Sequence, residues 1–419
     1  MSVTSAGVFK GDKVVWMVFL FLAIISILEV FSSSSTLSFK GGNYWYPIIK
    51  HAGMLLLGLL LMLVTLNIPC KYFKAFTAFL YPISLFMLLY VILAGNATND
   101  SHRWIDLFGM QFQPSEIAKG VVVIVCAQML SLLQTDDGLD KRAIMWIGAV
   151  NAPLLILIGL ENLSTAALLC ITIFMMLIVG RLSMRLVGAL MSVGVIVVGL
   201  GVGSVMIGGN TESEPPTNEV ETVAAADVAD DADDEAKPKK HALHRSGTWK
   251  SRIEKFFSNK YVSPEEFDID KDAQVAFSSV AIASSGFLGK GPGKSEQRDL
   301  LPQAYSDFIY AIVIEEWGLL GASIVAFLYL VLLFRTGQIA ERCENNFPVF
   351  LATGLAMMLV VQALFNMAVA VGLAPVTGQP LPLISRGGTS TVINCIYIGV
   401  ILSVSRTAKR KEVAEPQTA

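Results

Sequence analysis

The sequence predicts an all-α polytopic membrane protein with ten transmembrane helices and one long extracytoplasmic loop between the seventh and the eighth. Hydrophobic residues make up 54% of the 419-residue chain and charged residues only 16%, against about 25% charged residues in an average soluble domain. The apolar residues fall into continuous blocks of about 20, the length with which one helix crosses about 30 Å of hydrocarbon. Because these blocks do not alternate with polar residues, they exclude an outer-membrane β-barrel.

Ten apolar blocks follow one another along the chain. They lie at residues 14–31, 52–68, 73–94, 116–133, 143–160, 164–180, 186–208, 307–334, 347–371 and 388–405. Backbone groups inside lipid must hydrogen-bond within their own segment, so each block is predicted to be a helix. The composition therefore excludes an ordinary soluble enzyme, and the net charge of −3 gives no sign of a nucleic-acid partner.

Lysine and arginine gather at one set of helix ends. They are Lys10, Lys13, Lys71, Lys74, Lys141, Arg142, Arg181, Arg185, Arg335, Arg342, Arg406, Lys409, Arg410 and Lys411. The other short loops carry only Lys40, Lys50, Arg103 and Arg386. Since basic residues are retained on the cytoplasmic side, both termini are predicted to be cytoplasmic, including the tail at 407–419. No clear cleavage site follows the first block, which is predicted to remain a span.

The same orientation places the long connection at 209–306 outside the cytoplasm. Residues 210–236 hold ten acidic and no aromatic residues, and a basic stretch follows, so 210–247 is predicted to be a disordered insert. We interpret it as a solvated segment that tolerates length changes, with metal buffering or a partner-binding tail as alternatives. Apolar residues then recur at helical spacing over 249–257 among basic residues, which predicts a helix either in the membrane interface or packed on other spans.

The end of this loop, 289–295, resembles a phosphate-binding loop in its glycines and lysines. Leu288 stands where the Walker pattern needs its first glycine, and the extracytoplasmic location has no nucleotide supply, so ATP binding is excluded. We expect flexible backbone with exposed amides, flanked by Lys290, Lys294 and Arg298, that approaches a phosphorylated lipid headgroup. The five cysteines lie in spans or at cytoplasmic ends without metal spacing, so no disulfide framework is expected.

Ionisable residues at the mouths of spans are costly in lipid and are therefore candidates for function. The first group lies at 104–119, with the sequence WIDLFGMQFQPSEIAK. Pro114 is predicted in the first turn of the fourth helix, where Ser115 or Glu116 can satisfy the free amides. Glu116 and Lys119 are three residues apart and can neutralise each other. A capping and pairing device for a buried helix end is the alternative to a functional role.

The second group begins at the external mouth of the eighth helix, whose start is predicted by Pro302 and Ser306. Asp307 is either a helix cap or, if Ser306 caps the helix, a general base toward a membrane-bound hydroxyl. Glu315 and Glu316 lie two turns deeper and cannot both face lipid. At least one of them is expected to face a polar interior or to bind a cation.

The third group is the stretch 372–390, with three prolines and four glycines between two apolar blocks. It cannot form a regular helix. Irregular backbone at membrane depth is tolerated only where it is buried in protein or lines a polar cavity. We therefore expect this stretch inside the bundle, close to a polar site.

Together the three groups resemble the SEDS family (shape, elongation, division and sporulation), and its FtsW division branch more than its RodA elongation branch. The matching pieces are W-I-D-L-x-x-x-x-F-Q-P-S-E-I-A-K from 104, L-P-x-A-x-S-D-F-I-Y-x-x-x-x-E-E from 301 and P-V-T-G-x-P-L-P-L-I-S-x-G-G-T-S from 375. The resemblance covers most of the chain. It implies a single membrane domain over 1–419 in the bacterial cytoplasmic (inner) membrane.

The resemblance also implies a peptidoglycan glycosyltransferase that polymerises lipid II at the division septum. Asp307 takes the role of general base, which deprotonates the acceptor 4-hydroxyl in an inverting transfer. The expected substrate-binding residues are Trp104, Gln113, Ser115, Glu116, Lys119, Arg298, Ser385, Arg386, Gly387 and Gly388. Lys119, Arg298, Arg386 or a divalent cation such as Mg²⁺ or Mn²⁺ would stabilise the leaving lipid pyrophosphate. The implied partners are a class B penicillin-binding protein, which is a transpeptidase, and other division proteins.

The chain departs from the family pattern at three places. Tyr305-Ser306 replaces His-Thr before the key acid, residues 161–164 replace Pro-Asp-Leu-Gly, and Arg386 replaces an aromatic residue and can add anion binding. Two other functions stay open. One is a lipid II transporter, which needs a polar path through the membrane such as Glu116, Lys119 and Glu315. The other is a non-catalytic scaffold that activates a transpeptidase.

Overall fold

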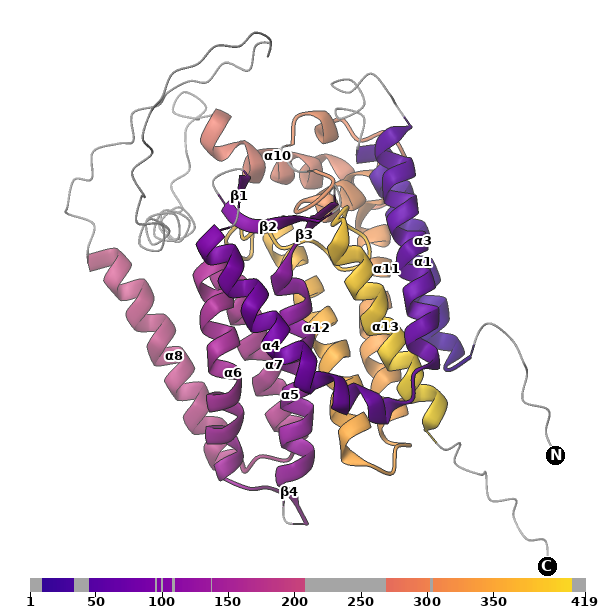
Figure 1. The fold of residues 1–419 in the computed structure, drawn as a ribbon. Coiled ribbons are helices and arrows are strands. Elements are labelled where there is room, and N and C mark those ends of the chain that lie inside the picture. Colours follow the sequence, from indigo (N-terminus) through magenta and orange to yellow (C-terminus); the bar gives the residue numbers. More distant parts are fainter. Residues whose placement is uncertain are drawn as a thin grey trace, which may run out of the picture. The chain divides into compact units, whose positions relative to one another are not determined.

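The computed structural model describes residues 10–33, 45–94, 96–98, 101–107, 110–136, 138–207, 269–301 and 304–408 (Figure 1). The predicted insert at 210–247, the predicted helix at 249–257 and the tail beyond Ala408 lie outside the described residues. Within α8 the chain passes from one compact unit into another at Val187. The packing given below is that of residues 10–187 and 269–408.

Each predicted apolar block falls within one helix, apart from one or two residues at its ends. The helices are α1 (Lys13–Ser33), α3 (Tyr46–Asn67), α4 (Cys70–Ala94), α5 (Pro114–Leu133), α6 (Arg142–Glu161), α7 (Leu163–Val179), α8 (Met184–Ile207), α11 (Ile309–Ala340), α12 (Asn346–Ala370) and α13 (Thr389–Thr407). Among the described residues, eight of these helices are long and apolar enough to cross a membrane. Of the other two, α7 has only 17 residues, and α8 contributes a shorter apolar stretch at Met184–Gly194.

The core of the bundle forms around α12 and α13, which are the most buried of the candidate spans, at 72% and 78%. α12 packs against α11, α5, α7 and α13, and α13 lies along α3. Glycines allow the last contact, because a Cβ atom on Gly58 would lie 2.7 Å from Cys395 Sγ and one on Gly399 would lie 2.9 Å from the Met62 carbonyl oxygen. Small residues that let helix backbones approach closely are typical of membrane bundles.

Short strands correct the all-α prediction. β1 (Asn96–Thr98), β2 (Ser101–Leu107) and β3 (Met110–Phe112) form an antiparallel sheet in that order, and β4 (Gln134–Thr135) pairs with β5 (Gly138–Leu139). The segment before α5 is therefore a small sheet rather than a plain loop.

Two further elements belong to the connection before α11. They are α10 (Ile269–Ser285) and the short 3₁₀ helix η1 (Gln297–Asp299). α10 packs against α11, and the Ser278 hydroxyl donates to the Ala370 carbonyl at the end of α12 (2.7 Å). Figure 1 shows α10 at the same end of the helices as the β1–β3 sheet.

α11 is not the continuous helix that the block at 307–334 predicts. It begins at Ile309 and is interrupted at Gly318, whose φ of 68° and ψ of −168° are non-helical. The residues before the break, 309–316, are all buried. A positive φ of this kind is readily adopted only by glycine, so Gly318 separates a short buried helix from the longer apolar one.

Candidate functional site

Asp307 lies in the turn that leads into α11, and the irregular stretch after α12 holds this turn in place. The Arg386 amide donates to the Tyr305 carbonyl (2.9 Å), and the Ser385 hydroxyl donates to the Ser306 carbonyl (2.5 Å). Next to the acid, Phe308 is 1% exposed and packs in an apolar cluster. The second and third groups of the sequence thus meet, and backbone hydrogen bonds set their relative position.

The Asp307 carboxylate is only partly buried. Its Oδ1 accepts a hydrogen bond from the Ser306 hydroxyl (3.0 Å). On the other side the chain passes close by, because a Cβ atom on Gly378 would lie 3.4 Å from Oδ2. The helix cap predicted for Ser306 or Asp307 is wrong, since the N-cap of α11 is Phe308 and no side chain caps it. Asp307 therefore lies one residue before the N-cap position of α11.

Only part of the irregular stretch 371–388 is buried in protein: Thr377, Gln379 and residues 381–385 are buried, whereas residues 371–373 are exposed. The Ser26 hydroxyl donates to the Ile384 carbonyl (2.7 Å), the Tyr329 hydroxyl donates to the Pro382 carbonyl, and the Leu381 amide donates to Ser385 Oγ (2.8 Å). These bonds replace the ladder that a helix would supply. Ser385 consequently acts twice, as an acceptor within its own loop and as a donor to the Asp307 turn.

Glu116 and Lys119 form the predicted ion pair at the start of α5, with 2.9 Å between Nζ and Oε2. Both side chains are almost fully buried. Lys119 Nζ also donates to Gln362 Oε1 of α12 (2.8 Å). The capping prediction for this helix is wrong. Gln113 is the N-cap without a side-chain bond, and the Ser115 hydroxyl is buried without a partner among the described residues.

The remaining predicted residues of the first and third groups lie at the junction of β3 and α13. The Thr389 hydroxyl donates to the Gln111 carbonyl (3.2 Å), so the glycines Gly387 and Gly388 lie near the sheet. Trp104 belongs to β2, opposite Asn96. Arg386 is partly exposed and lies over the Tyr305 ring, with 5.4 Å from Cζ to the ring centroid.

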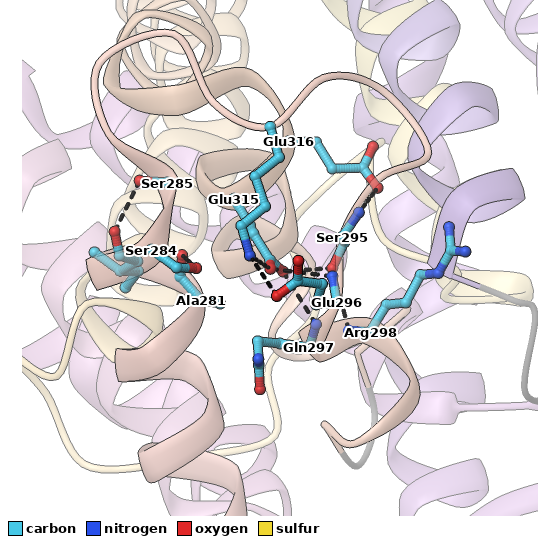
Figure 2. A network of polar contacts seen from close by, with 11 residues as sticks. Ala281, Ser284, Ser285, Ser295, Glu296, Gln297, Arg298, Glu315 and Glu316 are labelled. Carbon is cyan, nitrogen blue, oxygen red and sulfur yellow. Dashed lines mark hydrogen bonds and ion pairs between the residues drawn. The ribbon is translucent and has the colours of Figure 1, made fainter.

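Glu315 and Glu316 lie in a different setting, which we call the carboxylate clasp: these two residues together with the loop 289–298 that surrounds them (Figure 2). Glu315 accepts from the Ser295 hydroxyl, from the Lys290 ammonium (2.9 Å) and from the Glu296 amide (3.1 Å). The hydrogen bond to Glu315 raises the pKa of Lys290.

Glu316 accepts from the Gly293 amide (2.8 Å), from the Ser295 amide (3.4 Å) and from the Ser32 hydroxyl of α1. The expectation of exposed amides in this loop is therefore wrong, because the chain's own carboxylates bind them. Arg298 belongs to the same group, since it donates to Ser32 Oγ (3.1 Å) and to the Gly293 carbonyl (2.9 Å). The structure thus places Arg298 in the clasp and not among the residues around Asp307.

Both acids of the clasp are buried and accept hydrogen bonds from polar groups of the surrounding loop. Among the described residues, no group of three or more His, Cys, Asp or Glu side chains is arranged to hold a metal ion. The charge of Glu315 is instead opposed by the Lys290 ammonium.

Polar residues in the middle of α12 join the three groups, and the sequence prediction missed them. Gln362 contacts Lys119, and Asn366 donates to the Asp307 carbonyl (2.8 Å). Both are buried in a helix of otherwise apolar character. Two amides four residues apart in the block 347–371 were the available signal, because polar side chains inside a span are costly and lie on one helix face at that spacing.

The chain matches the model of the cell cycle protein family FtsW/RodA/SpoVE over residues 12–207 and 241–410. It is 26% identical over 398 residues to the peptidoglycan glycosyltransferase MrdB of Escherichia coli K12, which covers 94% of this chain and 93% of the relative. It is also 26% identical over 405 residues to the probable peptidoglycan glycosyltransferase FtsW of Geobacter sulfurreducens (96% of each chain). The similarity therefore does not separate the two branches.

Solved structures share the fold. A chain of a peptidoglycan synthase complex that coordinates polymerisation and crosslinking superposes with a TM-score of 0.70 at 20% identity, over 96% of this chain and 99% of the other. RodA of Thermus thermophilus gives a TM-score of 0.61 at 20% identity, over 96% and 98%. These matches confirm a helical polytopic membrane fold. With the family model covering most of its length, the chain belongs to the FtsW/RodA/SpoVE family of cell cycle proteins, the SEDS family that its motifs resemble.

Proposed function

We propose that the chain is a peptidoglycan glycosyltransferase that polymerises lipid II, with Asp307 as its general base. One observation carries the proposal. Asp307 has a partly exposed carboxylate in a turn that the other two family motifs hold in place, directly by the Ser385 and Arg386 bonds and through α12 by Asn366. A general base needs both access to the substrate proton and a fixed position. The names of the relatives agree with this activity.

In the proposed reaction, Asp307 accepts the proton of the 4-hydroxyl on the acceptor sugar. The oxygen then forms a bond to the anomeric carbon of the donor sugar from the face opposite the leaving group. The bond from that carbon to the lipid pyrophosphate breaks, and the pyrophosphate departs with the electron pair. The configuration at the anomeric carbon is inverted, as expected for a single displacement with a general base.

The anionic leaving group needs a cation nearby. Of the three candidates, Lys119 is already bound by Glu116 and Gln362, and Arg298 is bound within the carboxylate clasp. Arg386 is partly exposed and follows Ser385, which contacts the Asp307 turn. Arg386 is therefore the cation we favour for this role, and its charge strengthens any hydrogen bond to a phosphate.

The test uses the purified protein with its transpeptidase partner and labelled lipid II, scored for glycan chains. Asp307→Ala and Asp307→Asn are expected to lower the rate of polymerisation about 100- to 10,000-fold, whereas Asp136→Asn, which changes an exposed acid in the β4–β5 turn, serves as the matched control. Wild-type rates in both Asp307 variants would exclude the general-base role. If the wild-type protein makes no glycan but moves lipid II between leaflets, the transporter function is favoured instead. If it only activates the transpeptidase, the scaffold function is favoured.

We further propose ten spans with both termini in the cytoplasm of a bacterium, in its inner membrane, and with 209–306 outside. The ten helices and the distribution of basic residues support this topology. In a cysteine-free background, an impermeant maleimide added to intact cells or spheroplasts should label Asp299→Cys and leave Asp136→Cys unlabelled. The reverse pattern would invert the topology.

The proposed partners are a class B penicillin-binding protein and other division proteins, with action at the septum. The motif pattern supports the division branch, and the synthase complex among the similar structures supports a crosslinking partner. Depletion of the protein should give filamentous cells. Rounded cells would assign the protein to elongation.

A further inference from the structure

α12 carries two buried amide side chains one helical turn apart. Gln362 is 2% exposed and Asn366 is 1% exposed. The helix around them is apolar, so each unsatisfied polar atom there is costly. Their positions four residues apart place both amides on one face.

Each of the two amides joins two segments that are far apart in the chain. Gln362 accepts from Lys119 Nζ through Oε1 (2.8 Å) and donates through Nε2 to the Pro380 carbonyl (2.9 Å). Asn366 donates through Nδ2 both to the Asp307 carbonyl (2.8 Å) and to the Gln379 carbonyl (2.7 Å). The four bonds connect all three motif groups to one rigid helix.

The bond network continues beyond α12. Gln379 donates through Nε2 to the Thr165 hydroxyl in the first turn of α7 (2.9 Å). Asn162, just before it, caps that turn by accepting from the Ser164 and Thr165 amides (3.1 and 3.4 Å). The stretch that contains Gln379 is thus held from two helices, while the Asp307 turn is held from α12 and from residues 385–386.

We propose that Gln362 and Asn366 are positioning residues, which set the place of Asp307 relative to the Glu116–Lys119 pair. This inference rests on the proposed function. Neither amide acts on substrate in this role. Asn366 fixes the backbone of Asp307. Gln362 fixes the Lys119 ammonium and the Pro380 carbonyl of the irregular stretch relative to the same helix. A displacement of about 1 Å in such an arrangement can lower a rate by about 100-fold without changing any reacting group.

The experiment measures kcat and KM for glycan synthesis by the full-length protein with its partner. Asn366→Leu and Gln362→Met keep the side-chain volume and remove the bonds. We expect kcat to fall about 10- to 100-fold and KM to change less than about threefold. The control is Thr353→Val, a buried residue of the same helix whose hydroxyl bonds only to the Val349 and Phe350 carbonyls of its own helix.

A second measurement separates positioning from folding. In an Asp307→Asn background, Asn366→Leu should cause little further loss, because residues that act together are not additive. Wild-type kcat in both amide variants, or the same fold loss with and without Asp307, would overturn the inference. If Asn366→Leu does not fold, Asn366→Ser keeps one donor and is measured in the same way. The proposed function fails separately, if Asp307→Ala retains wild-type polymerisation.

Discussion

The segment 307–316 carries acids in two contrasting environments. Asp307 is partly exposed, lies outside the helix and is held through its backbone and its neighbours. Glu315 and Glu316, two turns further on, are 0% and 1% exposed and accept hydrogen bonds from a whole loop. The first arrangement places a partly exposed carboxylate at the mouth of α11, and the second uses carboxylates to hold the chain together.

The two environments distinguish a carboxylate that we propose for catalysis from carboxylates that stabilise the fold, although all of them are acids of one motif. Glu315 and Glu316 are buried, and their oxygens already accept hydrogen bonds from ammonium, hydroxyl and amide donors of the chain. A general base has to be reached by the proton it removes. The surroundings of these acids, and not their charge, therefore support the proposed role of Asp307 in the reaction and the structural role of Glu315 in the clasp.

The largest expected effect is on activity at Asp307. Asp307→Asn should lower the rate of glycan synthesis about 100- to 10,000-fold, the range typical of a general base. The melting temperature of the purified protein should stay close to that of the wild type, because this carboxylate is partly exposed and Asp307 is not the N-cap residue of α11. A loss of stability as large as that of a clasp variant would remove the contrast between the two acids.

The next effect is on stability at the clasp. Glu315→Gln removes a fully buried charge whose partners include the Lys290 ammonium, and should lower the free energy of unfolding by about 2–3 kcal/mol. Thermal unfolding followed by intrinsic fluorescence measures the change. Glu296→Gln is the matched control, since the Glu296 side chain is 73% exposed. The structural role of Glu315 would be contradicted if Glu315→Gln were as stable as the wild type and lost as much activity as Asp307→Asn.

The close approach of the backbone at Gly289 to the backbone at Gly318, next to the clasp, offers a third test. Gly289 and Gly318 both have positive φ, and a Cβ atom on Gly318 would lie 2.3 Å from the Phe287 carbonyl oxygen. Gly318→Ala should therefore lower the free energy of unfolding by about 2 kcal/mol or more. Gly53→Ala in α3, where the added methyl group meets nothing within 4 Å, should be neutral or slightly stabilising. Equal melting temperatures for the two variants would show that this close approach of the two backbone segments does not contribute to stability.

The helices were predictable because apolar blocks of the right length have one structural solution in lipid. The small sheet and the break at Gly318 were not, since two or three ladder residues and a single glycine leave little pattern. Local rules also failed at the helix starts. Ser306 and Ser115 have the right chemistry for caps, but Ser306 bonds to Asp307 and the Ser115 hydroxyl has no partner among the described residues.

The residues of the site could be predicted from the sequence motifs, but most of the contacts between them could not. Glu116 and Lys119 are close in sequence, so their pairing followed from spacing. The bonds of Asn366 to Asp307 and Gln379 join residues that only the folded bundle brings together. The clasp was missed for the same reason: the glycines of its loop suggested a free phosphate site, and only the fold shows that Glu315 and Glu316 occupy the amides.

The smallest expected effect concerns the pH dependence of the clasp. Lys290 has a pKa raised above its usual 10.5, first by its hydrogen bond to Glu315. A raised pKa means that the folded state holds the proton more tightly than the unfolded state, so the contribution to stability is complete below about pH 10 and is lost as the pH rises through the raised value. Lys290→Met should lower the free energy of unfolding by about 1 kcal/mol at pH 8 and should remove this alkaline dependence. Lys294→Met, which changes an exposed lysine of the same loop, should leave the dependence in place. If both variants lose stability with pH as the wild type does, Lys290 is not the cation that balances Glu315.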